Sequence, residues 1–249
     1  PGSRYLLRCR TAGVIATCAT IRDYYADGFG LDPETVPVIN GGVDCSFYTP
    51  DHPRNVMRAE LGIPGEAFLF GIIGRFSPVK GHRYFFEAAG KAARTAPGAW
   101  FVVAGWDAQL KRHDIVSMAR QAGIIERTRF TGRQNDIRDL IASIDAGVIA
   151  SVGSETVCRI AMEYLAMGTP VVATDTNVIP EVIRHEQAGI VTPKANPEAM
   201  AFAMERIAVS RQMAEAFGRA GRSRAAREYS LEQFAAKTLN AYRKMMIHV

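Results

Sequence analysis

Cysteine and histidine are scarce in this sequence. The four cysteines, Cys9, Cys18, Cys45 and Cys158, are widely spaced and form no CxxC pair. This spacing argues against a disulfide scaffold, and we expect reduced thiols, as in a cytoplasmic protein. The five histidines are scattered as well, so the sequence indicates no metal site.

Long apolar runs are also lacking. No stretch of the sequence reaches the length of a membrane-spanning helix. The first ten residues, PGSRYLLRCR, have neither the apolar core nor the small-residue cleavage site of a signal peptide. We therefore expect a cytoplasmic protein.

The composition is that of an ordinary globular protein, with 48% hydrophobic and 22% charged residues and a net charge of +5. All of the excess charge lies at the end of the chain. Residues 205–249 hold nine basic and four acidic residues, and the preceding 204 residues are balanced. The favoured interpretation is a solvated helix face, and contact with anionic lipid is the alternative. Nucleic acid is not an expected partner.

From residue 66 onward, apolar segments alternate with helical patterns. The segment FLFGIIG is a continuous apolar run, as a strand covered on both faces requires. The predicted strands are 68–74, 100–105, 129–131, 146–150, 170–174 and 189–191, and the predicted helices are 80–95, 108–122, one from Asp136 and one from Glu155. Strands separated by helices imply parallel βαβ units with right-handed crossovers. We predict an α/β fold with a doubly wound, Rossmann-like parallel sheet, whose ligands lie beyond the carboxyl ends of its strands.

The first 44 residues depart from this pattern. They contain a predicted strand at 13–18, a predicted helix at 19–30 and a strand at 36–44 that runs into a Gly-rich turn. One strand–helix pair cannot bury its own faces. We interpret residues 1–44 as the end of another domain plus a hinge, and residues 45–229 as the main domain.

Three predicted helices close the chain. Asn196 can cap the first of them, with Pro197 at its first helical position. Ser230 and Gln233 make a capping box for the last, within residues 230–249. This last helix carries an apolar stripe along one face, so it needs a partner.

Two cations follow the first strand of the alternating pattern. In GRFSPVKGH, residues 74–82, Gly74 permits a tight turn, and Arg75 and Lys80 project from a loop that precedes a helix. Cations beside a helix N-terminus favour a bound phosphate. The alternative is that both side chains are simply solvated.

Two glutamates eight residues apart follow a later strand. Residues 154–175 read SETVCRIAMEYLAMGTPVVATD, with Glu155 opening a helical run and Glu163 inside it. We expect Glu155 to stand in the loop at the helix mouth and Glu163 two turns down the helix, so that eight residues at the helical rise would separate them by roughly 12 Å. A carboxylate accepts two hydroxyl hydrogens at once, which suits a ribose diol or a sugar beside a diphosphate. The alternative is that Glu155 caps the helix and Glu163 forms a buried ion pair.

Together these segments resemble the donor-binding half of a GT-B glycosyltransferase, and within that fold the large retaining family 4. The resemblance covers residues 36–193 in consistent order. VINGGVD (38–44) resembles the hinge between that family's two domains, and residues 13–30 resemble the close of its acceptor-side domain. The resemblance also implies that the C-terminal helix, 230–249, crosses back onto that N-terminal domain. FTGRQNDI (130–137) is similar to a segment of lipopolysaccharide-core glucosyltransferases. The motifs that carry the resemblance are Gly74-Arg75, Lys80-Gly81, the pair Glu155 and Glu163, and AMGTPVVATDTNVIPEVI (166–183).

The resemblance implies a metal-independent enzyme that moves a sugar from a nucleoside-diphosphate sugar, with UDP favoured, to a glycan or lipid-linked acceptor. Arg75 and Lys80 would hold the diphosphate, Glu163 the ribose, and Glu155 would lie by the transferred sugar; Glu155, Arg75 and Lys80 are the expected catalytic residues. The remaining expected binding residues are Gly74, the backbone N–H groups of Thr156, Val157 and Cys158, and the loop Gly132, Arg133 and Gln134 at the base.

The sequence departs from that family in two places. Gly-Phe-Gly commonly follows the first glutamate, and Thr156-Val157-Cys158 stands here, which narrows the space beside the sugar. The hinge commonly reads Asn-Gly-Val-Asp, and Gly41 replaces that asparagine. Cys158, at a predicted helix N-terminus, is expected to be a packing residue rather than an activated thiol.

No DxD motif is present, so we expect neither a divalent metal nor another cofactor. Two cations and a helix dipole would stabilise the leaving diphosphate instead. The acceptor would be held mostly by the preceding domain, and a lipid-linked acceptor would bring the protein to the inner face of a membrane. The alternative functions are a nucleotide-sugar epimerase or phosphorylase of the same plan, or a non-catalytic basic module that binds anionic lipid or nucleic acid.

Overall fold

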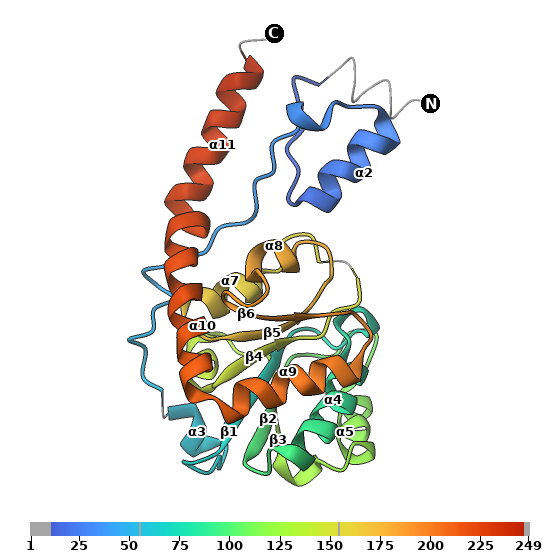
Figure 1. The fold of residues 1–249 in the computed structure, drawn as a ribbon, viewed down its shortest axis with the longest axis vertical. Coiled ribbons are helices and arrows are strands. Elements are labelled where there is room, and N and C mark those ends of the chain that lie inside the picture. The colour runs from blue at the N-terminus through green and yellow to red at the C-terminus, as the bar shows by residue number, and fades with distance from the viewer. Residues whose placement is uncertain (1–10, 55, 154, 247–249) are drawn as a thin grey trace.

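The computed structural model describes residues 11–54, 56–153 and 155–246 (Figure 1). The expectations for residues 1–10, which include the thiol of Cys9, lie outside the described residues, as does Ser154. Cys18, Cys45 and Cys158 are free thiols, as predicted.

A parallel sheet of six strands forms the centre of the described structure. Its order is β3-β2-β1-β4-β5-β6, and every neighbouring pair is parallel. The strands are β1 (Phe68–Ile73), β2 (Ala99–Ala104), β3 (Thr128–Thr131), β4 (Ala146–Ile149), β5 (Val171–Thr174) and β6 (Gly189–Thr192). The predicted doubly wound fold is confirmed. The strand order reverses between β1 and β4, and ligands of such sheets bind at this reversal.

Strand β1 shows why both faces of the sheet are covered. Phe68, Phe70 and Ile72 belong to one apolar core, and Leu69 belongs to the other, because successive side chains point to opposite faces. Figure 1 shows helices on both sides of the sheet. The first core includes residues of α4 (His82–Thr95), α5 (Arg112–Gln121), α9 (Pro197–Val209) and α10 (Arg211–Arg224). The second includes residues of α6 (Arg138–Ser143), α7 (Arg159–Ala166) and α8 (Ile179–Ile183).

Two predicted helices differ from the observed ones in the first half of the chain. The predicted helix 80–95 divides at Gly81, whose φ of 70° separates a short 3-10 turn, η2 (Pro78–Lys80), from α4. Helix α5 begins at Arg112 instead of near residue 108.

Three short elements were not predicted. They are helix α3 (Val56–Glu60), the 3-10 turn η3 (Ile125–Arg127) and helix α8.

The start of α7 is the correction that bears on function. The helix begins at Arg159, not at Glu155, because Cys158 holds a left-handed φ of 49° that a helix cannot continue through. Glu155 therefore stands in the loop before the helix, and Cys158 lies at the helix N-terminus, both as expected. The helical spacing of roughly 12 Å expected between Glu155 and Glu163 does not apply.

The predicted strands in the first 44 residues are wrong. Helix α2 (Ala19–Phe29) is found as predicted, followed by the 3-10 turn η1 (Pro33–Thr35). The segments 13–18 and 36–44 meet in a single parallel bridge between Ala16 and Val38. A strand needs a ladder, and the two segments pair with each other at this one position only within the described part of the chain. Whether the domains divide at residues 44 and 230 stays a prediction.

The C-terminal helices begin as predicted. Asn196 Oδ1 accepts a hydrogen bond from the N–H of Ala199 at 3.0 Å, and Ser230 Oγ accepts one from the N–H of Gln233 at 3.3 Å. After α10, a π-helical turn, η4 (Ala225–Tyr229), leads into α11 (Leu231–Met246).

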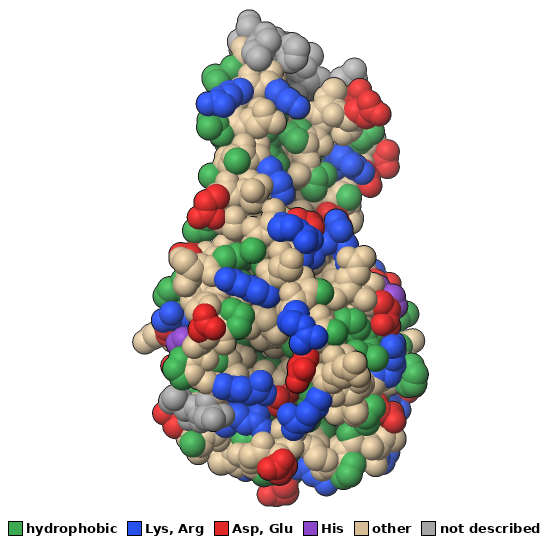
Figure 2. All heavy atoms as spheres, turned by 60° about the vertical axis from the view of Figure 1, so that its left-hand side comes forward, with side chains coloured by type: hydrophobic (Ala, Val, Ile, Leu, Met, Phe, Trp, Pro, Cys, Tyr) green, Lys and Arg blue, Asp and Glu red, His purple; other side chains and the backbone are tan. Residues whose placement is uncertain are grey.

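Helix α11 lies beside the N-terminal segment. Residues 237–245 of α11 and residues 11–14 and 31–39 line a hollow of about 480 Å³, and Ala241 is buried. Figure 2 shows Lys and Arg side chains on the side of the molecule that carries α10 and α11. Within the described ranges, we find no helix with the length and apolarity that a membrane span requires.

Candidate functional site

The loops after β1 and β4 meet at the reversal of the strand order. The N–H of Val152 donates to the carbonyl of Val79 at 2.9 Å, which ties the two loops together. Gly81 passes so close that a Cβ atom there would lie 1.8 Å from the carbonyl oxygen of Ala150. Only glycine allows this approach at a φ of 70°, so the sequence places the two loops in contact.

A hollow of about 520 Å³ opens at this edge of the sheet. Ten of the eleven predicted binding residues line it, and Thr156 is the exception. Four cationic and two carboxylate side chains lie in its wall, so the balance of charge favours an anion. The ten residues are Gly74, Arg75, Lys80, Gly132, Arg133, Gln134, Glu155, Val157, Cys158 and Glu163.

Glu155 is buried in this wall and firmly held. Its carboxylate forms an ion pair with the Nζ of Lys80 and accepts a hydrogen bond from Ser151 Oγ at 2.5 Å. The carbonyl of Ser151 accepts hydrogen bonds in turn from the hydroxyls of Thr174 at 2.5 Å and Thr176 at 2.7 Å. Two of the three expected catalytic residues, Lys80 and Glu155, therefore form one ion pair, in which the carboxylate is buried and the lysine is half-buried. The idea that Glu155 caps α7 is wrong, since Cys158 is the N-cap.

Arg75 is a cation of the hollow that remains available to a ligand. Its side chain is exposed at the mouth of the hollow and has no ion-pair or hydrogen-bond partner among the described residues. Arg133 lies over the ring of Trp106, 5.4 Å from its centroid. An unpaired guanidinium in a hollow beside a helix start is the arrangement that binds a phosphate.

Glu163 lies four residues into α7 and lines the hollow. Tyr48 Oη donates to its Oε1 at 3.2 Å, and the guanidinium of Arg159 lies 4.0 Å away. The buried ion pair considered for Glu163 is absent from the described contacts, because Arg159 is 83% exposed. Burial raises the pKa of Glu163, while the hydrogen bond from Tyr48 lowers it.

Cys158 is a packing residue, as expected. Burial and the neighbouring charge of Glu155 raise its thiol pKa well above the usual value, which is the opposite of activation. The residue is buried at a left-handed φ, where the resembling family commonly has glycine. Its thiol takes up space beside Glu155.

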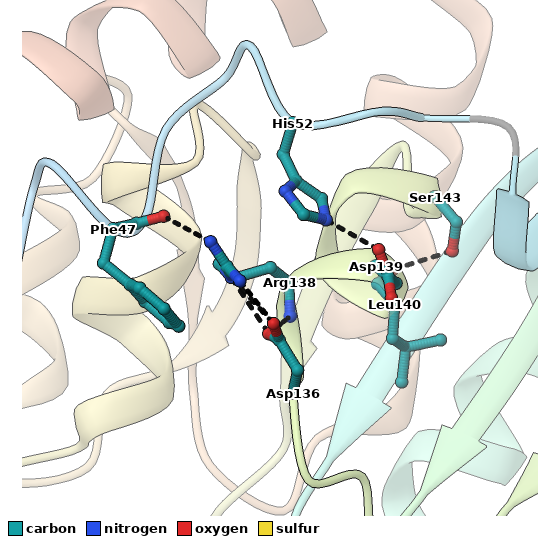
Figure 3. Close-up of polar contacts among 7 residues, drawn as sticks. All are labelled: Phe47, His52, Asp136, Arg138, Asp139, Leu140 and Ser143. Atoms are coloured by element: carbon teal, nitrogen blue, oxygen red, sulfur yellow. Dashed lines mark hydrogen bonds and ion pairs between the residues drawn. The ribbon is translucent and has the colours of Figure 1, made fainter.

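The segment that follows residue 44 is fastened to the loop behind the hollow (Figure 3). Arg138 binds both carboxylate oxygens of Asp136, holds the pKa of that carboxyl at about 2, and donates to the carbonyl of Phe47 at 3.4 Å. His52 Nε2 lies 2.6 Å from Asp139 Oδ1, at the start of α6. These contacts fix the loop at 132–137 against the main-chain segment that leads in from the N-terminal region.

Sequence reasoning missed two side chains here. Trp106 follows β2 at the same sheet edge as Arg75, so the strand-end rule that selected Arg75 also applies to it. Its ring is 45% exposed, which is unusual for a tryptophan beside a buried strand. Tyr48 carries no local signal, because it lies 115 residues from Glu163.

A doubly wound α/β domain with a basic hollow at its strand reversal defines a class of proteins that bind phosphate-bearing, nucleotide-like ligands. Residues 53–224 match the family model described as "Glycosyl transferases group 1". The chain therefore belongs to the group 1 glycosyl transferase family. The predicted resemblance to GT-B glycosyltransferases is confirmed.

Three similar proteins illustrate the family. The chain is 29% identical over 223 residues to "D-inositol 3-phosphate glycosyltransferase" from Saccharomonospora viridis, with 86% of this chain and 51% of that protein covered. The fold matches the structure of Anabaena Alr3699/HepE in complex with UDP and glucose, with a TM-score of 0.84 and 22% identity over 96% of this chain and 66% of that one. It also matches WaaG, a glycosyltransferase involved in lipopolysaccharide biosynthesis, with a TM-score of 0.77 and 17% identity over 91% of this chain and 61% of that one.

The chain spans about half the length of the curated relatives it matches, between 49% and 53% for four of them. Within the described residues, no cluster of three or more His, Cys, Asp or Glu side chains is placed to hold a metal ion.

Proposed function

We propose that this chain is the donor-binding part of a retaining, metal-independent glycosyltransferase that uses a nucleoside-diphosphate sugar. The observation that carries the proposal is the basic hollow at the strand reversal, where the free guanidinium of Arg75 lies beside the Lys80–Glu155 pair. An epimerase of the same plan would need the same donor site, so transfer to an acceptor distinguishes the two.

Each predicted residue has a role that its surroundings support. Arg75 and Lys80 would hold the diphosphate, with the first turn of α7 and the N–H groups at 156–158 adding partial positive charge. Glu163 would accept the ribose hydroxyls. Glu155, held by Lys80 and buried, would lie beside the transferred sugar.

The base would lie against the loop Gly132, Arg133 and Gln134. This loop lines the hollow together with the exposed ring of Trp106. UDP is the favoured nucleotide, and the fold neighbour from Anabaena is described with UDP and glucose.

A thermal-shift panel tests the proposal directly. UDP, GDP, ADP and their sugars should be compared, because a ligand of the native state raises the melting temperature by mass action. We expect the largest shift with a uridine ligand. No shift with any nucleoside diphosphate would contradict the proposed function.

Metal independence has its own test. Two cations and a helix start can stabilise a leaving diphosphate without a divalent ion. EDTA or added magnesium should therefore change the affinity for the donor little. A strict requirement for magnesium would contradict this part of the proposal.

The acceptor would be a glycan or a lipid-linked sugar. Because the chain covers about half of its relatives, we expect most acceptor contacts outside these 249 residues. The chain should bind donor yet transfer no sugar by itself, since half a cleft cannot align an acceptor or exclude water. The basic residues of the C-terminal helices would supply peripheral contact with anionic lipid, and salt should weaken that contact without affecting the donor site.

A further inference from the structure

We propose that Tyr48 is a positioning residue for Glu163 and thereby sets the preference of the hollow for a ligand with a vicinal diol. This inference rests on the proposed function, because it concerns how the same hollow recognises the ribose of a nucleoside diphosphate.

The contact joins two distant parts of the chain. Tyr48 Oη donates to Glu163 Oε1 at 3.2 Å, and the two residues are 115 positions apart. Glu163 lines the hollow, whereas Tyr48 is not among the lining residues. Tyr48 therefore acts on a ligand through the carboxylate and not by touching the ligand.

Tyr48 is itself held in place by the turn that precedes it. Asp44 Oδ1 accepts hydrogen bonds from the N–H groups of Ser46 at 2.9 Å and Phe47 at 3.0 Å. The N–H of Tyr48 donates to the carbonyl of Asp44 at 2.9 Å. This compact turn limits the positions that the tyrosine ring can take.

Arg222 fastens the same turn to the helix that carries Glu163. Its Nη1 donates hydrogen bonds to the carbonyl of Tyr48 and to the carbonyl of Ala166, each at 2.9 Å. Ala166 is the last residue of α7. The phenol and the carboxylate are thus attached to one framework, so their contact does not depend on a mobile segment.

The hydroxyl has a definite effect on the carboxylate. A carboxylate offers about four acceptor positions, and Tyr48 takes one, which fixes the rotation of the group and leaves the others for two ligand hydroxyls. Glu163 must also be ionised to accept from both hydroxyls. Burial raises its pKa, and the charge of Arg159 and the hydrogen bond from Tyr48 oppose that rise.

Tyr48 remains a donor throughout the ordinary pH range. Burial and the nearby charge of Glu163 raise its pKa to about 12, with Arg159 opposing and Asp136 adding to the rise. The phenol therefore still carries its proton at the pH where the carboxyl group of Glu163 loses its own.

The test is Tyr48→Phe, which keeps the ring and removes only the hydroxyl. Calorimetry should show UDP binding about three- to tenfold weaker, in the range of the net contribution of a typical hydrogen bond, because the lost bond acts on the ligand only through Glu163. Inorganic pyrophosphate, which has no diol, should bind as it does to the unaltered protein. The matched control is Tyr242→Phe, on the exposed side of α11, which should change neither affinity.

Two further readouts separate positioning from a general structural role. In a Glu163→Gln background, Tyr48→Phe should have no additional effect on UDP. The loss of UDP affinity on acidification should begin at a higher pH in Tyr48→Phe. The hydrogen bond from Tyr48 lowers the pKa of Glu163, so this pKa should rise when the hydroxyl is removed.

The outcomes are distinct. Equal losses for UDP and pyrophosphate, or an unchanged affinity for UDP, would overturn the inference while leaving the proposed function intact. If the unaltered protein binds no nucleoside diphosphate, the proposed function fails, and this inference fails with it.

Discussion

The two edges of the sheet each carry an ion pair with a largely buried carboxylate, and the two pairs differ in the charge that they leave available to a ligand. At the amino edge, Arg58 Nη1 lies 3.1 Å from Asp145 Oδ2, which also accepts the N–H of Leu69 at 2.7 Å. The exposed Arg54 pairs with the other oxygen of Asp145. The guanidinium of Arg58 donates further to the carbonyls of Ser143 at 2.9 Å and Ala67 at 2.6 Å. This pair is completed by the backbone around it.

At the carboxyl edge, Lys80 and Glu155 form the corresponding pair, but they face a hollow of about 520 Å³. Arg75 stands beside them without a partner among the described residues. One edge therefore uses its charges to close the fold, while the other keeps charge available for a ligand. The comparison predicts that changes at the two edges affect different measurements.

The largest effect should come from the amino edge. Arg58→Met removes the buried cation of Asp145 and leaves only the exposed Arg54 as its ion-pair partner, so the free energy of unfolding should fall by about 3–5 kcal/mol, measured by urea unfolding. The control is Arg83→Met, in an exposed pair on α4, which should leave stability nearly unchanged. A loss for Arg58→Met no greater than the control would contradict the comparison.

At the carboxyl edge, Arg75→Ala should weaken ligand binding and leave stability nearly unchanged. Affinity for a nucleoside diphosphate should fall by about 1.5–3 kcal/mol, as calorimetry would measure, because a hydrogen bond to a charged group is lost. The free energy of unfolding should hardly change, since the side chain is exposed. Arg219→Ala, on the exposed side of α10, is the matched control. If Arg75→Ala binds UDP, GDP and ADP as the unaltered protein does, the assignment of the site is wrong.

Glu163→Gln should have a more selective effect. It keeps the shape of the side chain and removes the charge, so UDP should bind less tightly while inorganic pyrophosphate binds nearly as before. Because burial raises the pKa of Glu163, the unaltered protein should lose UDP affinity as the pH falls through that raised value. The variant should lack this loss. An equal weakening of both ligands would point to a structural role for Glu163.

The smallest effect should come from the contact between residues 38–44 and the wall of the hollow. A Cβ atom at Gly41 would lie 2.6 Å from Val157 Cγ1, so Gly41→Ala should displace Val157 in the wall. We expect a loss of about 0.5–1.5 kcal/mol in unfolding free energy, the cost of an off-rotamer side chain. Adding Val157→Ala should reduce that loss. If the second substitution has no such effect, the two residues are not coupled.

Both positions where this sequence departs from the resembling family thus lie against each other. The sequence shows Gly41 and Val157 as unrelated departures, more than one hundred residues apart. Only the folded chain shows that Gly41 lacks the Cβ atom that would collide with the side chain of Val157.

The sequence by itself determined the sheet and the edge at which charge collects. Continuous apolar runs predict strands buried on both faces, and parallel strands bring their carboxyl ends to one edge. Arg75, Lys80, Glu155 and Glu163 were therefore expected together, and the structure places all four around one hollow.

Tertiary structure decided the partners and the local breaks. The strands expected in the first 44 residues reduce to isolated bridges, Ala16 with Val38 and Val43 with Ser230, because a ladder depends on a neighbour that local pattern does not specify. Helix α7 begins at Arg159 because Cys158 adopts a left-handed conformation, which cannot be predicted from a cysteine side chain. The pairing of Lys80 with Glu155 across 75 positions, and of Tyr48 with Glu163 across 115, follows from how the loops and the linker pack. Side chains so far apart in sequence meet only when the whole sheet has formed, so no local pattern could have paired them.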